Sequence, residues 1–428
     1  MRINVFKNTV LLFVLVMISC GNFSKKKVDG LKSENGSQIT VSDDPKPKTE
    51  NLEITVGANQ TEAYLPLLKG KRVGIVANQT SVIFKSNSGT KSKNQDSKHT
   101  HLVDSLLKLK ITINSVFAPE HGFRGTADAG EHIKDGIDTK TGVPIISLYG
   151  DNKKPKPEQL KNLDIIIFDI QDVGARFYTY ISSLHYVMEA CAEANIPVLI
   201  LDRPNPNGHY IDGPILEMEH KSFVGMHPIP IVHGMTIGEY AQMINGEKWL
   251  KNGAQCHLKV IPVKNYTHQM KYSLPIKPSP NLPNDKSINL YASLCFFEGT
   301  NVSVGRGTDK QFQIFGSPFL DSTIFKFKFT PKPNEGAKYP PHQDKVCYGM
   351  DLTTTEHLNG IHLNWLISAY NGTAKKSEFF NAFFTKLAGS KTLQQQIENG
   401  MLEKDIKASW QPGLETFKKT RTPYLLYK

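Results

Sequence analysis

The chain has 428 residues, a hydrophobic content of 39% and a formal net charge of +11. Its length exceeds that of one usual domain, and its apolar content is sufficient for a buried core, which excludes a largely disordered chain. The positive charge favours acidic ligands or envelope surfaces. No basic recognition helix, zinc-ligand array or RNA-binding motif accompanies it, so we expect no nucleic-acid partner.

Residues 1–20 have the pattern of an export signal. Two basic residues precede an apolar run at 10–18, which is too short to span a bilayer. Cys20 follows this run as in a bacterial lipoprotein signal, although Met17 is unusual three residues before such a cysteine. We expect residues 1–19 to be a signal peptide and a lipid on Cys20 to anchor a periplasmic lipoprotein to the membrane. An ordinary secretory signal cleaved nearby is the alternative.

The rest of the chain divides by composition into three segments. Residues 20–55 are rich in Lys, Ser, Asn, Asp and Pro and show almost no apolar periodicity, which predicts a flexible tether. Residues 56–272 alternate strand-like and helix-like stretches, which predicts an α/β domain. Residues 273–428 begin with a proline-rich connection and have the pattern of a smaller α+β domain.

A parallel sheet is predicted for the α/β segment because its strands are near-continuous runs of Val, Ile and Leu. Such strands are buried on both faces, with helices as the covering layers. The predicted strands are 72–77, 111–117, 143–148, 164–169 and 197–201, and the predicted helices between them include 102–109 and 178–194.

Polar side chains recur at one place in this pattern, directly after each strand. The carboxyl ends of parallel strands meet at one edge of the sheet, where ligands bind in open α/β folds. We therefore expect these residues to gather at that edge: Asn78, Glu120, Tyr149, Gln171, Asp172, Arg203 and Asn205. No glycine-rich phosphate loop follows the first strand, so we expect no dinucleotide and no other cofactor.

The loop after the second strand, residues 117–132, is the densest cluster of ionisable groups. Its glycines allow tight turns and a close approach to a ligand, which makes it a candidate active site. A solvated surface loop is the alternative. The candidate ligand-contacting residues in it are Glu120, His121, Arg124, Asp128 and Glu131.

Glu120 is the first candidate for acid or base catalysis. It lies at a strand end between Phe117 and Phe123, and partial desolvation raises the pKa of a carboxyl group. Glu298 follows an apolar run and is a candidate second carboxylate. Glycosidic bond hydrolysis commonly uses two carboxyl groups roughly 5 to 9 Å apart. The alternative for each glutamate is a structural ion pair with an arginine.

The remaining candidates are binding groups. Arg176, Arg203 and Arg306 suit bidentate binding of a carboxylate or phosphate, and Tyr178 suits stacking on a sugar. The nearby histidines and acids follow no recognised metal-site spacing, so we expect no bound metal. Those residues are His121, His132, His233, Asp128 and Glu131.

Seven segments together resemble the NamZ-type exo-β-N-acetylmuramidases. They are APEHGFRG at 118–125, ADAGE at 127–131, DIQDVGARFYTYI at 169–181, LDRPNPNG at 201–208, HGMTIGE at 233–239, PSPNLP at 278–283 and FEGTNVSVGRGT at 297–308. The resemblance extends from about residue 70 to the C-terminus. The chain departs from it by a polar insertion at 85–98.

The resemblance implies a Rossmann-like domain followed by an auxiliary domain, with the site between them. It also implies release of N-acetylmuramic acid from the non-reducing ends of peptidoglycan fragments, with the catalytic glutamate at Glu120. Within the matching motifs we expect further substrate contacts from these residues: Gln171, Asn205, His233, Asn281, Asn301 and Thr308.

Muramic acid fits the candidate arginines, because it carries a lactyl carboxylate that arginine side chains can bind. We expect Glu120 to protonate the leaving oxygen, and either Glu298 or Asp172 to act on water or the anomeric carbon. Assistance by the 2-acetamido group is the other route. A non-catalytic muropeptide-binding lipoprotein and a metal-dependent cell-wall amidase or esterase are the rival functions. No pattern indicates an oligomeric state.

Overall fold

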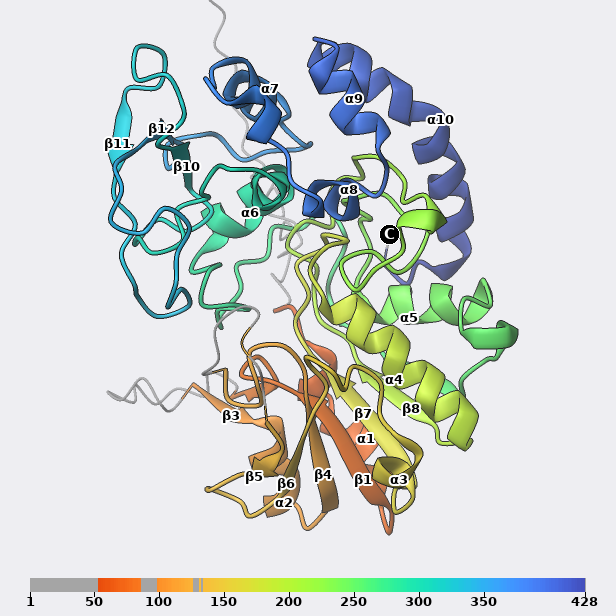
Figure 1. The fold of residues 1–428 in the computed structure, drawn as a ribbon. Coiled ribbons are helices and arrows are strands. Elements are labelled where there is room, and N and C mark those ends of the chain that lie inside the picture. Colours follow the sequence, from red (N-terminus) through yellow and green to blue (C-terminus); the bar gives the residue numbers. More distant parts are fainter. Residues whose placement is uncertain (1–52, 86–97, 126–130, 132–133, 428) are drawn as a thin grey trace, which may run out of the picture. The chain divides into compact units, whose positions relative to one another are not determined.

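A seven-stranded sheet lies at the centre of the N-terminal half (Figure 1). The computed structural model describes residues 53–85, 98–125, 131 and 134–427. The strand order is β5-β6-β4-β1-β7-β8-β9, and every neighbouring pair is parallel except β5 with β6. The strands are β1 (Arg72–Ala77), β4 (Thr112–Ala118), β5 (Gly136–Ile137), β6 (Pro144–Ser147), β7 (Ile165–Asp169), β8 (Val198–Leu201) and β9 (Leu258–Ile261).

Helices cover both faces of this sheet, because alternate residues of its strands are apolar on either side. In β7, Ile165 and Ile167 join one hydrophobic cluster, whereas Ile166 and Phe168 join the other. The first cluster includes α1 (Thr61–Leu68) and α2 (Leu102–Lys108). The second includes residues of α3 (Pro157–Leu160), α4 (Tyr180–Ala194) and α5 (Ile237–Gly246). The predicted α/β class with a parallel sheet is confirmed.

The C-terminal half is a smaller mixture of helices and an antiparallel sheet. Its three strands have the order β10-β12-β11, in which both pairs are antiparallel. They are β10 (Ile314–Ser317), β11 (Phe327–Phe329) and β12 (Cys347–Asp351). The helices are α6 (Asp285–Leu294), α7 (Asn364–Asn371), α8 (Phe383–Ala388), α9 (Thr392–Glu398) and α10 (Glu403–Arg421).

Several short elements complete the fold. A two-stranded antiparallel ribbon, β2 (Val82–Phe84) with β3 (His99–His101), flanks the sequence insertion. The short 3-10 helices are η1 (Gly57–Asn59), η3 (Met218–His220), η4 (Lys251–Gly253), η5 (Cys295–Gly299), η6 (Lys376–Glu378) and η7 (Thr422–Tyr424). None of the helices in the described ranges is both long and apolar enough to cross a bilayer.

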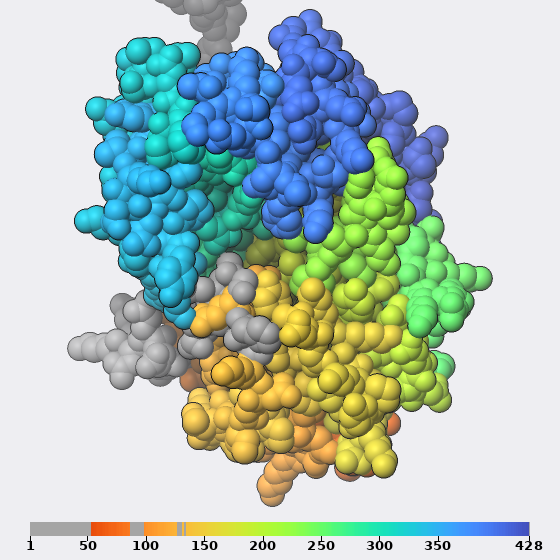
Figure 2. Space-filling model, in the orientation of Figure 1, coloured from red at the N-terminus to blue at the C-terminus, as the bar shows by residue number. Residues whose placement is uncertain are grey.

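The two halves share one hydrophobic core. The cluster that covers one face of the sheet continues through α6, η5 and α8 to α10, and residues 52–428 form one compact unit. Figure 2 shows the N-terminal half, in orange and yellow, in the lower part of one face and the C-terminal residues, in blue, in its upper part. The domain boundary after residue 272 stays a prediction, but residues from both sides of it build the site described next.

Candidate active site

A cavity of about 450 Å³ lies at the junction of the two halves. The N-terminal half contributes Glu120, His121, Tyr149, Gly150, Lys153, Phe177, Tyr178, Thr179, Phe223 and Val224. The C-terminal half contributes Ser279, Asn281, Leu282, Tyr291, Cys295, Glu298, Arg306, Phe312, Phe383 and Leu387. The size is that of a small-ligand site, and both polar and aromatic side chains line it.

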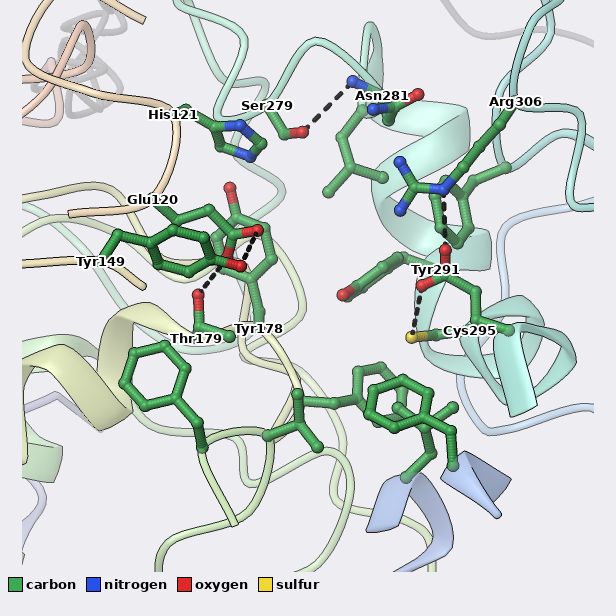
Figure 3. Close-up of a pocket in the computed structure, with 18 of the residues that line it drawn as sticks. Glu120, His121, Tyr149, Tyr178, Thr179, Ser279, Asn281, Tyr291, Cys295 and Arg306 are labelled. Atoms are coloured by element: carbon green, nitrogen blue, oxygen red, sulfur yellow. Dashed lines mark hydrogen bonds and ion pairs between the residues drawn. The ribbon is translucent and has the colours of Figure 1, made fainter. Parts of the chain in front are cut away.

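Glu120 lies on the wall formed by the loop after β4. Its Oε1 accepts a hydrogen bond from the Tyr149 hydroxyl at 3.0 Å, and its Oε2 accepts one from the Thr179 hydroxyl at 2.6 Å (Figure 3). Burial and the Glu120 carboxylate together raise the pKa of Tyr149, so this hydroxyl keeps its proton and remains a donor. The carboxyl group is thereby held in position from two sides.

The backbone after Glu120 turns sharply. His121 has φ +71°, in the left-handed region that costs a non-glycine residue energy, and its side chain is buried on the cavity wall. Gly125 has φ +74°, and a Cβ there would lie 2.7 Å from the Gln79 side chain. These conformations bring His121 beside Glu120 and close the loop against the residues that follow β1.

Arg306 lies on the wall opposite Glu120 (Figure 3), and Glu298 lines the same cavity. Arg306 Nε donates to Glu298 Oε1 at 2.7 Å, and the Cys295 thiol lies 3.6 Å from Glu298 Oε2. The Arg306 guanidinium also lies over the Phe312 ring, 5.2 Å from its centroid. Burial alone lowers the pKa of Arg306, but the adjacent Glu298 carboxylate outweighs this effect and the net shift is upward.

Asn281 and Tyr178 also line the cavity. Asn281 Nδ2 donates to the Gly336 carbonyl at 2.8 Å, while its buried Oδ1 has no partner among the described residues. The Tyr178 hydroxyl donates to the Pro278 carbonyl at 2.8 Å, so its ring edge is fixed. An amide and an aromatic ring so placed suit the hydroxyl groups and the apolar face of a sugar.

Five of the predicted substrate-contacting or catalytic residues therefore meet in the cavity beside Glu120. They are His121, Tyr178, Asn281, Glu298 and Arg306. Three of the predicted residues lie outside the part of the chain that the structure describes, namely Asp128, His132 and Cys20.

Arg176 does not line the cavity, and its surroundings differ from those expected of a substrate-binding arginine. It is fully buried, and its terminal nitrogens donate to the backbone carbonyls of Pro214, Ile229, Leu387 and Ala388 at 2.7–3.0 Å. Burial lowers its pKa to about 9. Two of these carbonyls belong to α8 in the C-terminal half, so Arg176 joins the two halves.

Arg203 is likewise engaged within the protein. Its Nε and Nη2 bind both oxygens of Asp169 at 2.7 and 2.9 Å, and Nη2 also donates to the Val82 carbonyl. Both side chains are buried. This bidentate pair at the ends of β7 and β8 has the geometry predicted for a substrate carboxylate, but a protein carboxylate fills it.

The other strand-end residues form a buried network beneath the cavity. Gln171 donates to the carbonyls of Asp172 and Pro204, and Asn205 donates to the Met235 carbonyl. Asp172 Oδ2 accepts from the Gly174 amide and lies 3.9 Å from His233 Nε2. Burial raises the pKa of Asp172 to about 7 and lowers that of His233 to about 3. None of the four residues is among those that line the cavity.

The last four predicted contacts also lie away from the cavity lining. Arg124 binds Asp138 at 2.7 Å and Asp104 at 3.3 Å. Glu131 pairs with Lys338 at 2.7 Å. Asn301 Nδ2 donates to the Glu378 carbonyl, and the Thr308 hydroxyl donates to the Gly305 carbonyl, so both side chains fix loops.

The sequence did not indicate that Thr179 and Lys153 line the cavity, nor that Tyr149 binds Glu120. Tyr149 had a signal, because it follows a predicted strand as Glu120 does. Thr179 begins α4 as its N-cap residue, and its hydroxyl binds Glu120 instead of the helix backbone. Lys153 lies with its Nζ 5.0 Å from the centroid of the Phe223 ring, at the apolar side of the cavity.

Among the described residues, the group of acids and histidines close enough to hold a metal ion is Glu217, Glu219 and His220. These residues are absent from the cavity lining, and exposed carboxylates dominate the group. The chemistry available in the cavity is therefore that of a carboxyl group, an arginine–glutamate pair, hydroxyl groups and aromatic rings.

Comparison with known proteins gives one family for both halves. The family model described as exo-beta-N-acetylmuramidase NamZ, N-terminal, matches residues 73–286, and the corresponding C-terminal model matches residues 289–427. The peptidoglycan beta-N-acetylmuramidase NamZ of Bacillus subtilis (strain 168) is 41% identical over 384 residues, which cover 85% of this chain and 89% of that protein.

Two crystal structures of DUF1343 family proteins from Bacteroides fragilis NCTC 9343 have a similar fold. BF0379 is 48% identical with a TM-score of 0.79, and BF0371 is 27% identical with a TM-score of 0.74. Each alignment covers 88% of this chain and 99% of the solved chain.

Proposed function

This chain belongs to the NamZ family of exo-β-N-acetylmuramidases, and from that premise we propose that it releases N-acetylmuramic acid from the non-reducing ends of peptidoglycan fragments. The observation that carries this proposal is the cavity at the junction of the two halves, with the Glu120 carboxyl group on one wall and Arg306 on the other. A cavity of about 450 Å³ suits a terminal sugar rather than a long glycan strand.

In the proposed reaction Glu120 is the general acid. It gives its proton to the glycosidic oxygen while the bond from that oxygen to the anomeric carbon breaks, and a water hydroxyl then bonds to the anomeric carbon. The second proton of that water returns to Glu120 through solvent, which restores the starting state. Tyr149 and Thr179 orient the carboxyl group, since each hydroxyl binds one of its oxygens.

The second step can proceed without another protein carboxylate. Asp172 is buried beneath the cavity, and Glu298 already binds Arg306 and the Cys295 thiol through its two oxygens. These engagements favour assistance by the 2-acetamido group, whose carbonyl oxygen attacks the anomeric carbon before water opens the resulting ring. Glu298 as the base for water is the alternative.

Product analysis tests the activity directly. Incubation with a defined fragment that ends in N-acetylmuramic acid should release that free sugar, as identified by mass spectrometry. Glu120→Gln should lower kcat on a chromogenic muramic acid glycoside by about 10³-fold. The control is Glu158→Gln, on an exposed carboxylate of α3. Unchanged turnover by Glu120→Gln would remove the catalytic assignment and favour a binding protein, whereas loss of activity with a chelator would favour a metal-dependent hydrolase.

We also propose that the enzyme is an exported, periplasmic lipoprotein anchored through Cys20. The support is the sequence of residues 1–20, with its basic start, short apolar run and terminal cysteine. Cys20→Ser should abolish incorporation of labelled palmitate and move the protein from the membrane to the soluble fraction. Membrane association that persists in this variant would contradict the anchor.

A further inference from the structure

The cavity contains one of the three arginines that the sequence offered for binding an acidic substrate. Arg176 donates to backbone carbonyls and Arg203 to Asp169, so neither guanidinium is available to a ligand. Arg306 lines the cavity. Recognition of a substrate carboxylate by arginine within the described cavity therefore falls to this residue.

The Arg306 guanidinium is only partly used by the protein. Its Nε donates to Glu298, while its two terminal nitrogens have no hydrogen-bond acceptor within the part of the chain that the structure describes. Figure 3 shows the guanidinium directed into the cavity, towards the wall that carries Glu120. Two parallel N–H groups on one guanidinium edge match the two oxygens of a carboxylate.

Arg306 lies in a tight backbone turn between two glycines. Gly305 and Gly307 have φ +79° and +78°, a conformation that side chains disfavour. A Cβ at Gly305 would lie 2.6 Å from Ile314, and one at Gly307 would lie 2.6 Å from Pro340. The two glycines therefore allow a tight turn, and this turn holds Arg306 at one position on the cavity wall.

Glu298 completes this arrangement from the other side. Its Oε1 binds Arg306 Nε, its Oε2 faces the Cys295 thiol, and Phe312 lies beneath the guanidinium. Both oxygens of this carboxylate are therefore engaged by protein groups. Its contribution is to leave the terminal edge of the guanidinium pointing into the cavity.

We propose that Arg306 binds the lactyl carboxylate of the terminal muramic acid and that Glu298 is its positioning residue. This inference rests on the proposed function and adds the feature that distinguishes muramic acid from the otherwise identical N-acetylglucosamine. The guanidinium and the carboxylate form two parallel charge-assisted hydrogen bonds, while Glu120 on the facing wall protonates the glycosidic oxygen. A substrate whose lactyl group is an amide lacks one acceptor and the negative charge.

The test compares two chromogenic glycosides, one of N-acetylmuramic acid and one of its lactyl amide. Wild-type enzyme should prefer the acid by about 10- to 100-fold in kcat/KM, as expected for a charge-assisted bidentate contact. In Arg306→Gln this ratio should fall to near one, through a higher KM for the acid. Arg306→Lys should keep part of the preference, because lysine retains the positive charge but lacks the paired N–H donors of the guanidinium.

Arg72→Gln is the matched control, since Arg72 also binds a single carboxylate, Asp164, but lies at the exposed start of β1. Its acid-to-amide ratio should equal that of wild type. Glu298→Gln keeps an acceptor for Arg306 Nε, so its kcat should stay within about tenfold of wild type while KM for the acid rises. A loss of about 10³-fold in kcat would instead make Glu298 a catalytic group.

The outcomes separate this inference from the proposed function. Activity of wild type with an acid-to-amide ratio near one, or an unchanged ratio in Arg306→Gln, overturns the role of Arg306 and leaves the glycosidase assignment standing. No hydrolysis of either glycoside by wild type overturns both. If Arg306→Gln fails to fold, the wild-type ratio and the intermediate ratio of Arg306→Lys decide the question.

Discussion

The carboxyl edge of the central sheet has two sides that differ in exposure. Polar residues on one side line the cavity, whereas those on the other side are buried in contacts with the rest of the protein. After β4 and β6, on one side, Glu120, His121 and Tyr149 face the cavity. At the ends of β7 and β8, on the other side, Asp169 and Arg203 are buried in protein contacts. Both sides carry the same sequence signal, a polar residue after an apolar strand. That signal locates the edge of the sheet, whereas the segments that cover the edge decide which side is open.

The covering segments come from far along the chain. Asp202, after β8, accepts hydrogen bonds from the Thr236 hydroxyl and the Gly238 amide at the start of α5, and from the Tyr427 hydroxyl near the C-terminus. Glu239 accepts from the amides of Leu426 and Tyr427. The end of the chain therefore seals the β8 side. On the β4 and β6 side, Glu120, His121 and Tyr149 line the cavity instead.

The largest expected effect is a difference in unfolding free energy between an arginine substitution on the buried side and one at the cavity. Arg203→Met leaves Asp169 buried without its cation, and breaking a buried pair in this way typically costs about 3–5 kcal/mol. Arg306→Met, on the cavity wall, should cost less than Arg203→Met, because 18% of the Arg306 side chain and 24% of the Glu298 side chain remain exposed. Denaturant unfolding monitored by circular dichroism measures both. Equal costs for the two variants would contradict the division into a sealed and an open side.

The fold was predictable because its signal is local to each strand. A run such as residues 164–169 is apolar on both faces, and a strand of that kind requires helices on both sides. The position of Glu120 at the cavity was predictable for a similar reason, since its loop concentrates ionisable groups at a strand end. Arg306 was one of three candidate arginines, and the structure adds that both of its flanking glycines have positive φ values.

The partners of the other candidates could not be predicted, because distant backbone groups supply them. Arg176 follows a strand as a substrate-binding residue would, yet its acceptors are carbonyls of Ile229 and Leu387 among others. A carbonyl is present at every residue and leaves no mark in the side-chain pattern. The bonds from Thr179 and Tyr149 to Glu120 also join three separate loops, which only the packed sheet brings together.

The second expected effect uses Asp172, on the sealed side. Burial raises the pKa of this carboxyl to about 7, whereas an unfolded aspartate titrates near ~3.9. Between these values the folded protein holds a proton that the unfolded chain has lost. The contribution of Asp172 to stability is therefore greatest below about pH 4, falls as pH rises towards 7, and is constant above it. From pH 5 to 7 the fall is at most about 2.7 kcal/mol.

Asp172→Asn should remove that pH-dependent fall while keeping an oxygen acceptor for the Gly174 amide. The measurement is the difference in unfolding free energy between wild type and variant at pH 5, 6 and 7, which should change in favour of the variant as pH rises. Asp164→Asn is the control, because hydrogen bonds from Arg72 lower the pKa of that exposed carboxyl to about 2, outside this range. A difference that is the same at all three pH values would contradict the assignment.

The smallest expected effect tests how the open side holds its carboxyl group. Tyr149→Phe removes the hydroxyl that binds Glu120 Oε1 but keeps the ring, and we expect kcat to fall about tenfold, or about 1.4 kcal/mol. Thr179→Val removes the bond to Oε2 and should act in the same direction. An unchanged kcat in both variants would mean that the two hydroxyl groups do not orient the Glu120 carboxyl group, and the position of this group would then depend on packing alone.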